Sequence, residues 1–171
     1  MLSSSMEKAI VKQINAEFYS SYLYLAMSAY LEGAGLPGMA NWMKNQTQEE
    51  IFHGMKMYDF VHERGGRVIL GAIDCPPADW DSTLAVFENV LAHEQKVTGL
   101  INDLVNLAQD ERDHATNIFL QWFVSEQVEE EATASGIIQK LKMIENDASS
   151  LFGLDQELGQ RVFTPPVQGK Q

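Results

Sequence analysis

Four carboxylates and one imidazole interrupt otherwise apolar helical stripes in this sequence, and together they are typical ligands of a pair of divalent metal ions. Glu50 and His53 are three residues apart, so a helix would place their side chains next to each other. Glu17, Glu94 and Glu130 each lie on a separate stripe. A buried carboxylate without a counter-charge costs on the order of several kcal/mol. Because no Lys or Arg lies on these stripes, a metal pair is the economical counter-charge.

The ligand types narrow the choice of metal. Oxygen-rich ligands with one imidazole suit Fe, Mn or Zn rather than copper, and calcium rarely takes a histidine. Glu50 has two oxygens and is predicted to bridge the two ions. Di-metal helix bundles can carry Glu-x-x-His on two helices, but here the second motif reads Gln127-x-x-Glu130. One histidine is therefore missing, and the second metal is predicted to bind more weakly.

A second acidic set lies one residue away from the stripes. Glu49 precedes Glu50, and Glu126 and Glu129 are three residues apart beside Glu130. These side chains could hold a third ion next to the pair. The alternative is an ordinary solvated helix face, which is what a run of charges usually forms. Spacing alone leaves both interpretations open.

The aromatic and remaining histidine residues are interpreted by the same spacing. Tyr24 lies two turns beyond Glu17 on the same stripe, where a buried hydroxyl needs a hydrogen-bond partner. A metal-bound carboxylate would supply that partner, and donation of an electron during oxygen chemistry is a second possible role. His62, His93 and His114 have no acidic partner on a stripe and are interpreted as surface or structural residues.

The periodicity predicts an all-α fold. Pro37 suits the first turn of the second helix, and Ser4 and Glu7 have the spacing of a capping box. We expect long helices over residues 6–31, 37–64, 82–108 and from about 114 to 146, followed by a short fifth helix over 147–158. An extended, mobile tail is expected from about residue 164.

The connection over residues 66–81 has no helical period and is unusually long for a compact domain. A four-helix bundle needs such a crossover if its second and third helices run parallel. The expected architecture is therefore a four-helix bundle with a long crossover and a short C-terminal fifth helix.

Composition limits the number of domains, the partners and the location that we expect. A chain of 171 residues with 45% hydrophobic content fits one domain, residues 1–171, with a real core. Its net charge of −12 disfavours nucleic acid and anionic membranes as partners and attracts cations. Cys75 is the single cysteine, so no internal disulfide can form. With neither a signal peptide nor an apolar run of membrane-spanning length, we expect a cytoplasmic protein.

Several motifs, in order and with matching spacing, resemble those of prokaryotic non-haem ferritins. The similarity extends from about residue 5 to Pro166 and is carried by NAEFYSSYLYL (15–25), ANWM (40–43), EEIFH (49–53), ERGGRV (63–68), AHE (92–94) and WFVSEQVEE (122–130). This ordered set is far more specific than a lone Glu-x-x-His.

The resemblance implies iron storage with ferroxidase activity, using O2 or peroxide to oxidise Fe(II). It also implies a hollow shell of 24 subunits, with the fifth helix packed around channels. By resemblance, the first iron takes Glu17, Glu50 and His53; the second takes Glu50, Glu94 and Glu130 with Gln127 nearby; and the third takes Glu49, Glu126 and Glu129 with help from Glu130.

Related subfamilies and other functions remain as alternatives. Haem-binding bacterioferritins have methionine after the glutamate of the first Glu-x-x-His, where this chain has Ile51, so no haem is expected. The small DNA-protecting relatives place their metal site between subunits. A di-iron oxygenase, or an oxygen-binding bundle protein without storage, is the alternative function.

Overall fold

The computed structural model describes residues 1–144 and 147–165, and the described part contains five helices and no strand. The expected mobile tail from residue 164 falls mostly outside these residues, and the expected single domain over 1–171 stays a prediction. The predicted all-α architecture is confirmed. The helices are α1 (Ser4–Gly33), α2 (Pro37–Glu63), α3 (Thr83–Asp110), α4 (His114–Ile144) and α5 (Ala148–Leu158).

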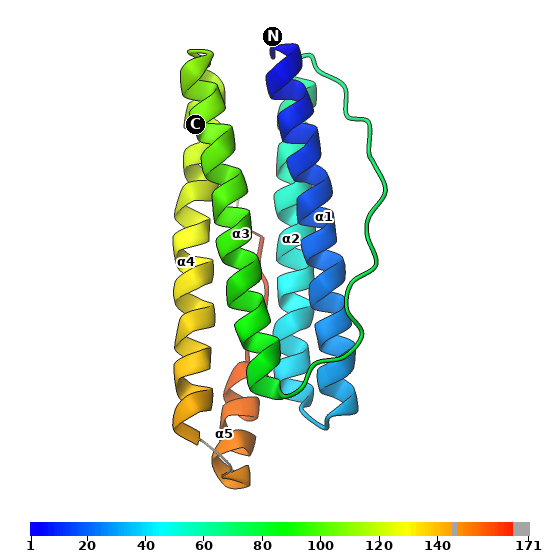
Figure 1. Ribbon diagram of the computed structural model, residues 1–171, viewed down its shortest axis with the longest axis vertical. Coiled ribbons are helices and arrows are strands. Elements are labelled where there is room, and N and C mark those ends of the chain that lie inside the picture. The colour runs from blue at the N-terminus through cyan, green and yellow to red at the C-terminus, as the bar shows by residue number, and fades with distance from the viewer. Residues whose placement is uncertain (145–146, 166–171) are drawn as a thin grey trace.

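The four long helices form a bundle in which α2 and α3 run in the same direction (Figure 1). Helices α1 and α2 are an antiparallel pair, as are α3 and α4. Between the pairs, the chain crosses the whole length of the bundle outside α1. This is the long connection that the sequence predicted, and it lets each helix contribute its middle to the same level of the bundle.

Hydrogen bonds fasten the crossover to α1 at three heights. At the start of the helix, Glu7 accepts from the Arg67 backbone N–H at 3.2 Å. In the middle, the side-chain amide of Asn15 accepts from Gly71 N at 3.0 Å and donates to Ala72 O at 3.1 Å. Near the end, the Tyr30 hydroxyl donates to the carbonyl of Trp80 at 2.7 Å. The crossover is therefore a fixed part of the bundle's surface.

Local capping explains where the helices begin. The capping box predicted at Ser4 and Glu7 is wrong: Ser3 is the N-cap, and its Oγ accepts from Met6 N at 3.0 Å. Glu7 is instead engaged by the crossover. Ser82 caps α3 in the same way, accepting from Ala85 N at 3.1 Å.

Two separate apolar cores fill the bundle, one toward each end. The first lies toward α5 and includes Tyr24, Met27, Trp42, Phe87 and Leu141. The second lies toward the N-terminus of α1 and includes Ile10, Ile14, Met57, Phe60 and Phe123. Between them the inward-facing positions are polar. The fold therefore places one polar layer between two apolar cores.

Helix α5 docks against the beginning of α2 through a buried carboxylate. Asp155 accepts hydrogen bonds from Gly38 N at 3.1 Å and from Met39 N at 2.8 Å. These are among the backbone donors that the start of a helix leaves free. The negative charge also lies at the positive end of the α2 dipole. Helix α5, too short to be stable alone, is held by this cap.

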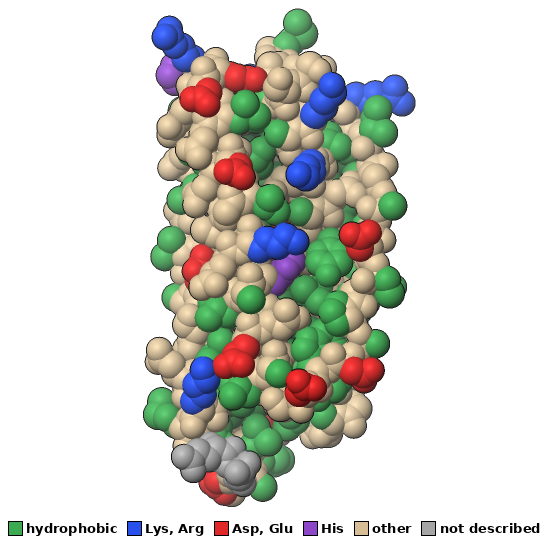
Figure 2. All heavy atoms as spheres, in the orientation of Figure 1, with side chains coloured by type: hydrophobic (Ala, Val, Ile, Leu, Met, Phe, Trp, Pro, Cys, Tyr) green, Lys and Arg blue, Asp and Glu red, His purple; other side chains and the backbone are tan. Residues whose placement is uncertain are grey.

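The outer surface carries charges of both signs. On the face shown in Figure 2, acidic and basic side chains are scattered among hydrophobic ones. None of the helices within residues 1–144 and 147–165 combines the length and apolar character needed to cross a membrane.

Candidate metal centre

The polar layer brings together buried side chains from all four long helices. Every member is less than a tenth exposed. Each sits near the middle of its helix, where the stripe pattern placed it. They are Glu17 from α1, Glu50 and His53 from α2, Glu94 from α3, and Gln127 and Glu130 from α4.

Glu17, Glu50 and His53 form a compact ligand set. One ligand atom from each lies within 4.8 Å of the others, and His53 Nδ1 is 3.4 Å from Glu50 Oε2. Glu17 Oε1 accepts from the Gln13 amide at 2.9 Å. By contrast, Glu17 Oε2 and Glu50 Oε2 are buried and accept no hydrogen bond from the described residues. Either a shared proton or a divalent cation satisfies both oxygens, so the donor set fits a metal ion.

His53 is kept neutral by its surroundings. Its ring packs edge-on against Trp122 at 5.3 Å and against Phe123 at 6.0 Å between centroids. Burial in this aromatic pocket lowers the pKa of His53 to about 4, and the Lys56 charge adds to the effect. A neutral imidazole has a free lone pair, which is the form that binds a metal.

Glu94 and Glu130 are also buried, but their oxygens are occupied by neighbouring side chains. The Tyr24 hydroxyl donates to Glu94 Oε1, and the Gln127 amide donates to Glu94 Oε2 at 3.1 Å. Gln46 donates to Glu130 Oε2 at 2.9 Å. Within residues 1–144 and 147–165, these carboxylates do not join Glu50 in a set as compact as the first. Gln127 therefore positions Glu94 by donating to it.

The crowded carboxylates resist ionisation. Burial raises the pKa of Glu17 to about 7, against the hydrogen bond from Gln13. Burial, together with the charge of Glu94, raises the pKa of Glu130 to about 8. Burial also raises the pKa values of Glu50 and Glu94. Because a layer that holds protons at neutral pH must release them when a dication binds, the affinity for the dication depends on pH.

The second acidic set is only partly assembled. One ligand atom each from Glu49, His53 and Glu126 lies within 4.8 Å of the others. His53 therefore stands between two possible ion positions. Glu129 is exposed and is not part of this compact group. Its charge nevertheless contributes to raising the pKa values of Glu49 and Glu126, after burial as the main cause.

Tyr24 meets the expectation that it needs a partner, and one of the other histidines is deeply placed. Tyr24 is fully buried and donates to Glu94. His93 is 9% exposed, packs against the edge of Tyr24 and has its Nε2 2.8 Å from Ser20 Oγ. It is structural, in agreement with its interpretation from sequence, and it holds Tyr24 in place from the side of α3.

Three residues at this layer were missed by the sequence reasoning. Gln13 and Gln46 lie four residues before Glu17 and Glu50 on the same stripes, so their spacing was an available signal. Arg161, which pairs with Glu49 at 2.5 Å, follows α5 and lies on no helical stripe. No local pattern pointed to it.

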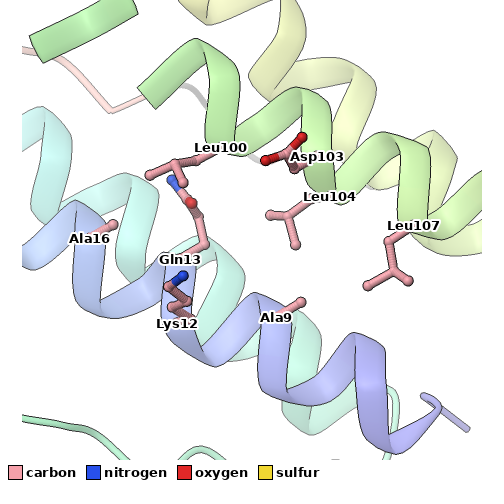
Figure 3. Close-up of a pocket in the computed structure, with 8 residues that line it drawn as sticks. All are labelled: Ala9, Lys12, Gln13, Ala16, Leu100, Asp103, Leu104 and Leu107. Carbon is pink, nitrogen blue, oxygen red and sulfur yellow. The ribbon is translucent and has the colours of Figure 1, made fainter. Parts of the chain in front are cut away.

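A cavity of about 220 Å³ lies next to the layer, between α1 and α3. Figure 3 shows Gln13 reaching from α1 toward α3, with Leu100, Asp103 and Leu104 on the opposite wall. Because Gln13 also donates to Glu17, its side chain contacts both this cavity and the compact ligand set.

Comparisons with known proteins agree with this architecture. A family model described as the ferritin-like domain matches residues 7–144. The bacterial non-heme ferritin of Bacteroides fragilis (strain 638R) is 48% identical over 161 residues, covering 94% of this chain and all of the relative. That of Staphylococcus aureus (strain MRSA252) is 38% identical over 163 residues, covering 95% of this chain and 98% of the relative.

Solved ferritin structures have the same fold. An open-pore ferritin from Archaeoglobus fulgidus is 54% identical, with a TM-score of 0.94 over 95% of this chain and all of that one. A form of the same archaeon's ferritin engineered to be closed is 55% identical, with a TM-score of 0.95 over 96% of this chain and all of that one. The fold, the buried carboxylate–histidine layer and these similarities together place the chain in the ferritin family.

Proposed function

We propose that this protein stores iron and oxidises Fe(II) to Fe(III) at the polar layer. The observation that carries the proposal is the compact set of Glu17, Glu50 and His53, with two buried carboxylate oxygens facing a common point. The names of its relatives, bacterial non-heme ferritins, support the same function. Iron is the substrate and the cargo.

The ligands are assigned as follows. Glu17, Glu50 and His53 bind the first Fe(II). Glu94 turns from Tyr24 and Glu130 turns from Gln46 to bind the second, with Glu50 between the two ions and Gln127 still donating to Glu94. Glu49, Glu126 and Glu129 provide a third position beside the pair, and Tyr24 is available to give up an electron. No haem is required.

The chemistry follows from holding two Fe(II) ions in one dry, anionic site. Each iron loses one electron, and O2 takes both electrons with two protons to give hydrogen peroxide; peroxide as the oxidant instead gives water. Carboxylate ligands favour Fe(III), because the higher charge gains more from anionic neighbours. Hydrolysis of Fe(III) then releases protons as the ion leaves for the mineral.

Storage needs an enclosed space, which one bundle lacks. We propose a homo-oligomeric shell, with 24 subunits as the expected number, in which α5 lines contacts between subunits. We also propose that the shell works in the cytoplasm, where the single exposed Cys75 stays reduced.

The two irons should bind with unequal affinity, because the second position has carboxylates but no histidine. For the first two ions, anaerobic Fe(II) titration of the purified protein should give one tighter and one weaker step per subunit, and oxygen should then oxidise both. Mass measurement and iron counting on the same sample test storage. Two equally tight steps would contradict the ligand assignment. A monomer or dimer that turns over oxygen without accumulating iron would favour the oxygenase alternative.

Metal affinity should rise with pH across the neutral range. The pKa values of Glu17 and Glu130, about 7 and about 8, mean that both hold protons at about pH 6 and lose them by about pH 9. Each proton displaced by the ion adds about a tenfold gain in affinity per pH unit until its pKa is passed. Titration calorimetry with Zn(II) in buffers of different ionisation heat would measure the protons released.

The same pKa shifts predict how the metal-free protein responds to pH. Glu17 and Glu130, whose pKa values are raised, contribute stability to the folded state. This contribution is complete below their ordinary pKa of about 4.5 and is lost as the pH rises through 7 to 8. His53 acts oppositely: its contribution is complete above about 6.5 and is lost as pH falls through about 4. Without metal, the temperature of unfolding should therefore fall between pH 6 and pH 9, and Zn(II) should remove most of that loss of stability. A Zn(II) affinity that does not change with pH would contradict the ligand assignment.

A further inference from the structure

The chain that follows α5 runs back along α2 toward the metal layer. We name residues 159–163 the C-terminal strap. Asn41 Nδ2 donates to Gly159 O at 3.2 Å and to Arg161 O at 3.1 Å. Asn45 Nδ2 donates to Arg161 O at 3.1 Å, and Asn45 Oδ1 accepts from Phe163 N at 2.5 Å. The strap is thus fixed to one face of α2 over more than one turn.

The strap delivers a guanidinium to a carboxylate of the second acidic set. Arg161 Nη2 lies 2.5 Å from Glu49 Oε2. The Arg161 side chain is 24% exposed and that of Glu49 18%, so water screens the pair only partly. The guanidinium also lies 4.6 Å from the centre of the Trp42 ring, which holds it over α2. Asn41, Asn45 and Glu49 are four residues apart, so one helical face positions both the strap's backbone and its charge.

Glu49 therefore has two competing positive partners. Its carboxylate belongs to the compact group with His53 and Glu126, where a third ion would bind. One of its oxygens is already engaged by Arg161. A second guanidinium nitrogen, Nη1, is buried and has no hydrogen-bond partner among the described residues. Arg161 is therefore bound less completely than a guanidinium can be, which lowers the cost of displacing it.

We propose that Arg161 is a built-in counter-cation of the third ion position, which holds Glu49 when no ion is bound and competes with the ion for it. This inference rests on the third-ion site proposed above. An ion bound there and Arg161 share one carboxylate, and an ion that takes Oε2 releases Glu49 from Arg161. The competition keeps the third position weak compared with the first, so that an ion placed there exchanges instead of remaining. Arg161 also lies near Glu130, whose pKa its charge helps to lower against the larger effect of burial.

The test is a titration of the intact, metal-free protein with Zn(II), which resembles Fe(II) in its ligands but is not oxidised. Arg161→Gln should tighten the weakest binding step about tenfold, the size of effect typical for residues that contact a ligand rather than the metal. The first step should not change. Arg161→Lys keeps the charge and should stay near wild type. Lys142→Gln removes an exposed charge paired with Glu88 at 2.9 Å and is the matched control.

A second readout separates this role from mere fastening of the strap. Without metal, Arg161→Gln should unfold at a lower temperature because Glu49 loses its partner, and saturating Zn(II) should remove the difference. Asn45→Ala loosens the strap's backbone while keeping the arginine, and should tighten the weakest step by a smaller factor. A residue that only fastens the strap would lower the unfolding temperature and leave zinc affinity unchanged or weaker.

These variants separate failure of the Arg161 inference from failure of the third-ion site. If Arg161→Gln binds the weakest zinc no tighter than wild type, the inference is wrong even if the site exists. If Glu49→Gln and Glu126→Gln both keep the weakest step intact, the third site itself is wrong, and the role of Arg161 falls with it. Loss of that step in both glutamine variants, with tightening in Arg161→Gln, supports both.

Discussion

Replacing Glu50 with alanine should abolish fast Fe(II) oxidation while leaving the bundle folded. Glu50 is 2% exposed, pairs with His53 and lies close to Glu17, so its loss removes the ligand that we propose both irons share. Even a residue that only orients a metal ligand is worth about 10–100-fold in affinity or activity. We therefore expect at least about a 100-fold lower initial rate, measured by stopped-flow absorbance after mixing Fe(II)-loaded protein with oxygen.

His53→Ala should behave similarly, because it removes the imidazole that we propose binds the first iron. Glu88→Ala is the matched control: it deletes an exposed glutamate of α3 and should oxidise iron at the wild-type rate. Circular dichroism and particle mass should match wild type for all three variants. Fast oxidation that persists in Glu50→Ala and His53→Ala would show that the iron reacts elsewhere in the protein.

Gly38→Ala should be the most destabilising small substitution near α5. A Cβ at this position would lie 1.8 Å from the Asp155 carbonyl oxygen, so α5 must shift. Overpacking costs about 1–3 kcal/mol, and freeing the buried Asp155 from its two backbone donors adds about 1–3 kcal/mol. We expect the free energy of unfolding to fall by about 2–6 kcal/mol, measured by chemical denaturation of the metal-free protein.

Gly99→Ala gives the opposite expectation. Gly99 lies inside α3, and a Cβ there meets nothing within 4 Å among the described residues. Alanine in a helix interior is more stable than glycine by about 0.5–1 kcal/mol, so this variant should be slightly more stable than wild type. Equal stabilities of the two variants would mean that α5 does not dock on α2 as described.

Much of the fold was predictable from sequence, because the apolar stripes have helical period and the breaks between them carry Gly and Pro. The crossover followed from its length alone. The N-cap of α1 was predicted one residue late, at Ser4, since Ser3 and Ser4 are equivalent in type and only the backbone geometry decides which one caps the helix. The docking of α5 through Asp155 could not be predicted, since it joins residues more than a hundred positions apart.

The positions of the candidate site residues were also predictable from sequence. Glu17, Glu50, His53, Glu94 and Glu130 share one layer because each interrupts a stripe near mid-helix. The distribution of hydrogen bonds inside the layer was not predictable, since it depends on rotamers chosen across helices, such as Gln46 reaching Glu130 instead of a neighbour on α2. The pairing of Arg161 with Glu49 depends on the path of an irregular segment, which periodicity does not describe.

The division of the apolar packing into two cores has a consequence for turnover. Tyr24, Met27 and Phe87 belong to one core, and Ile14 and Phe123 to the other. Each apolar core packs the helices together on its own side of the polar layer. The relative positions of the helices therefore do not depend on what the layer binds. In the proposed iron oxidation, ions and protons enter and leave this layer repeatedly, while the packed helices on either side keep the ligand side chains in position.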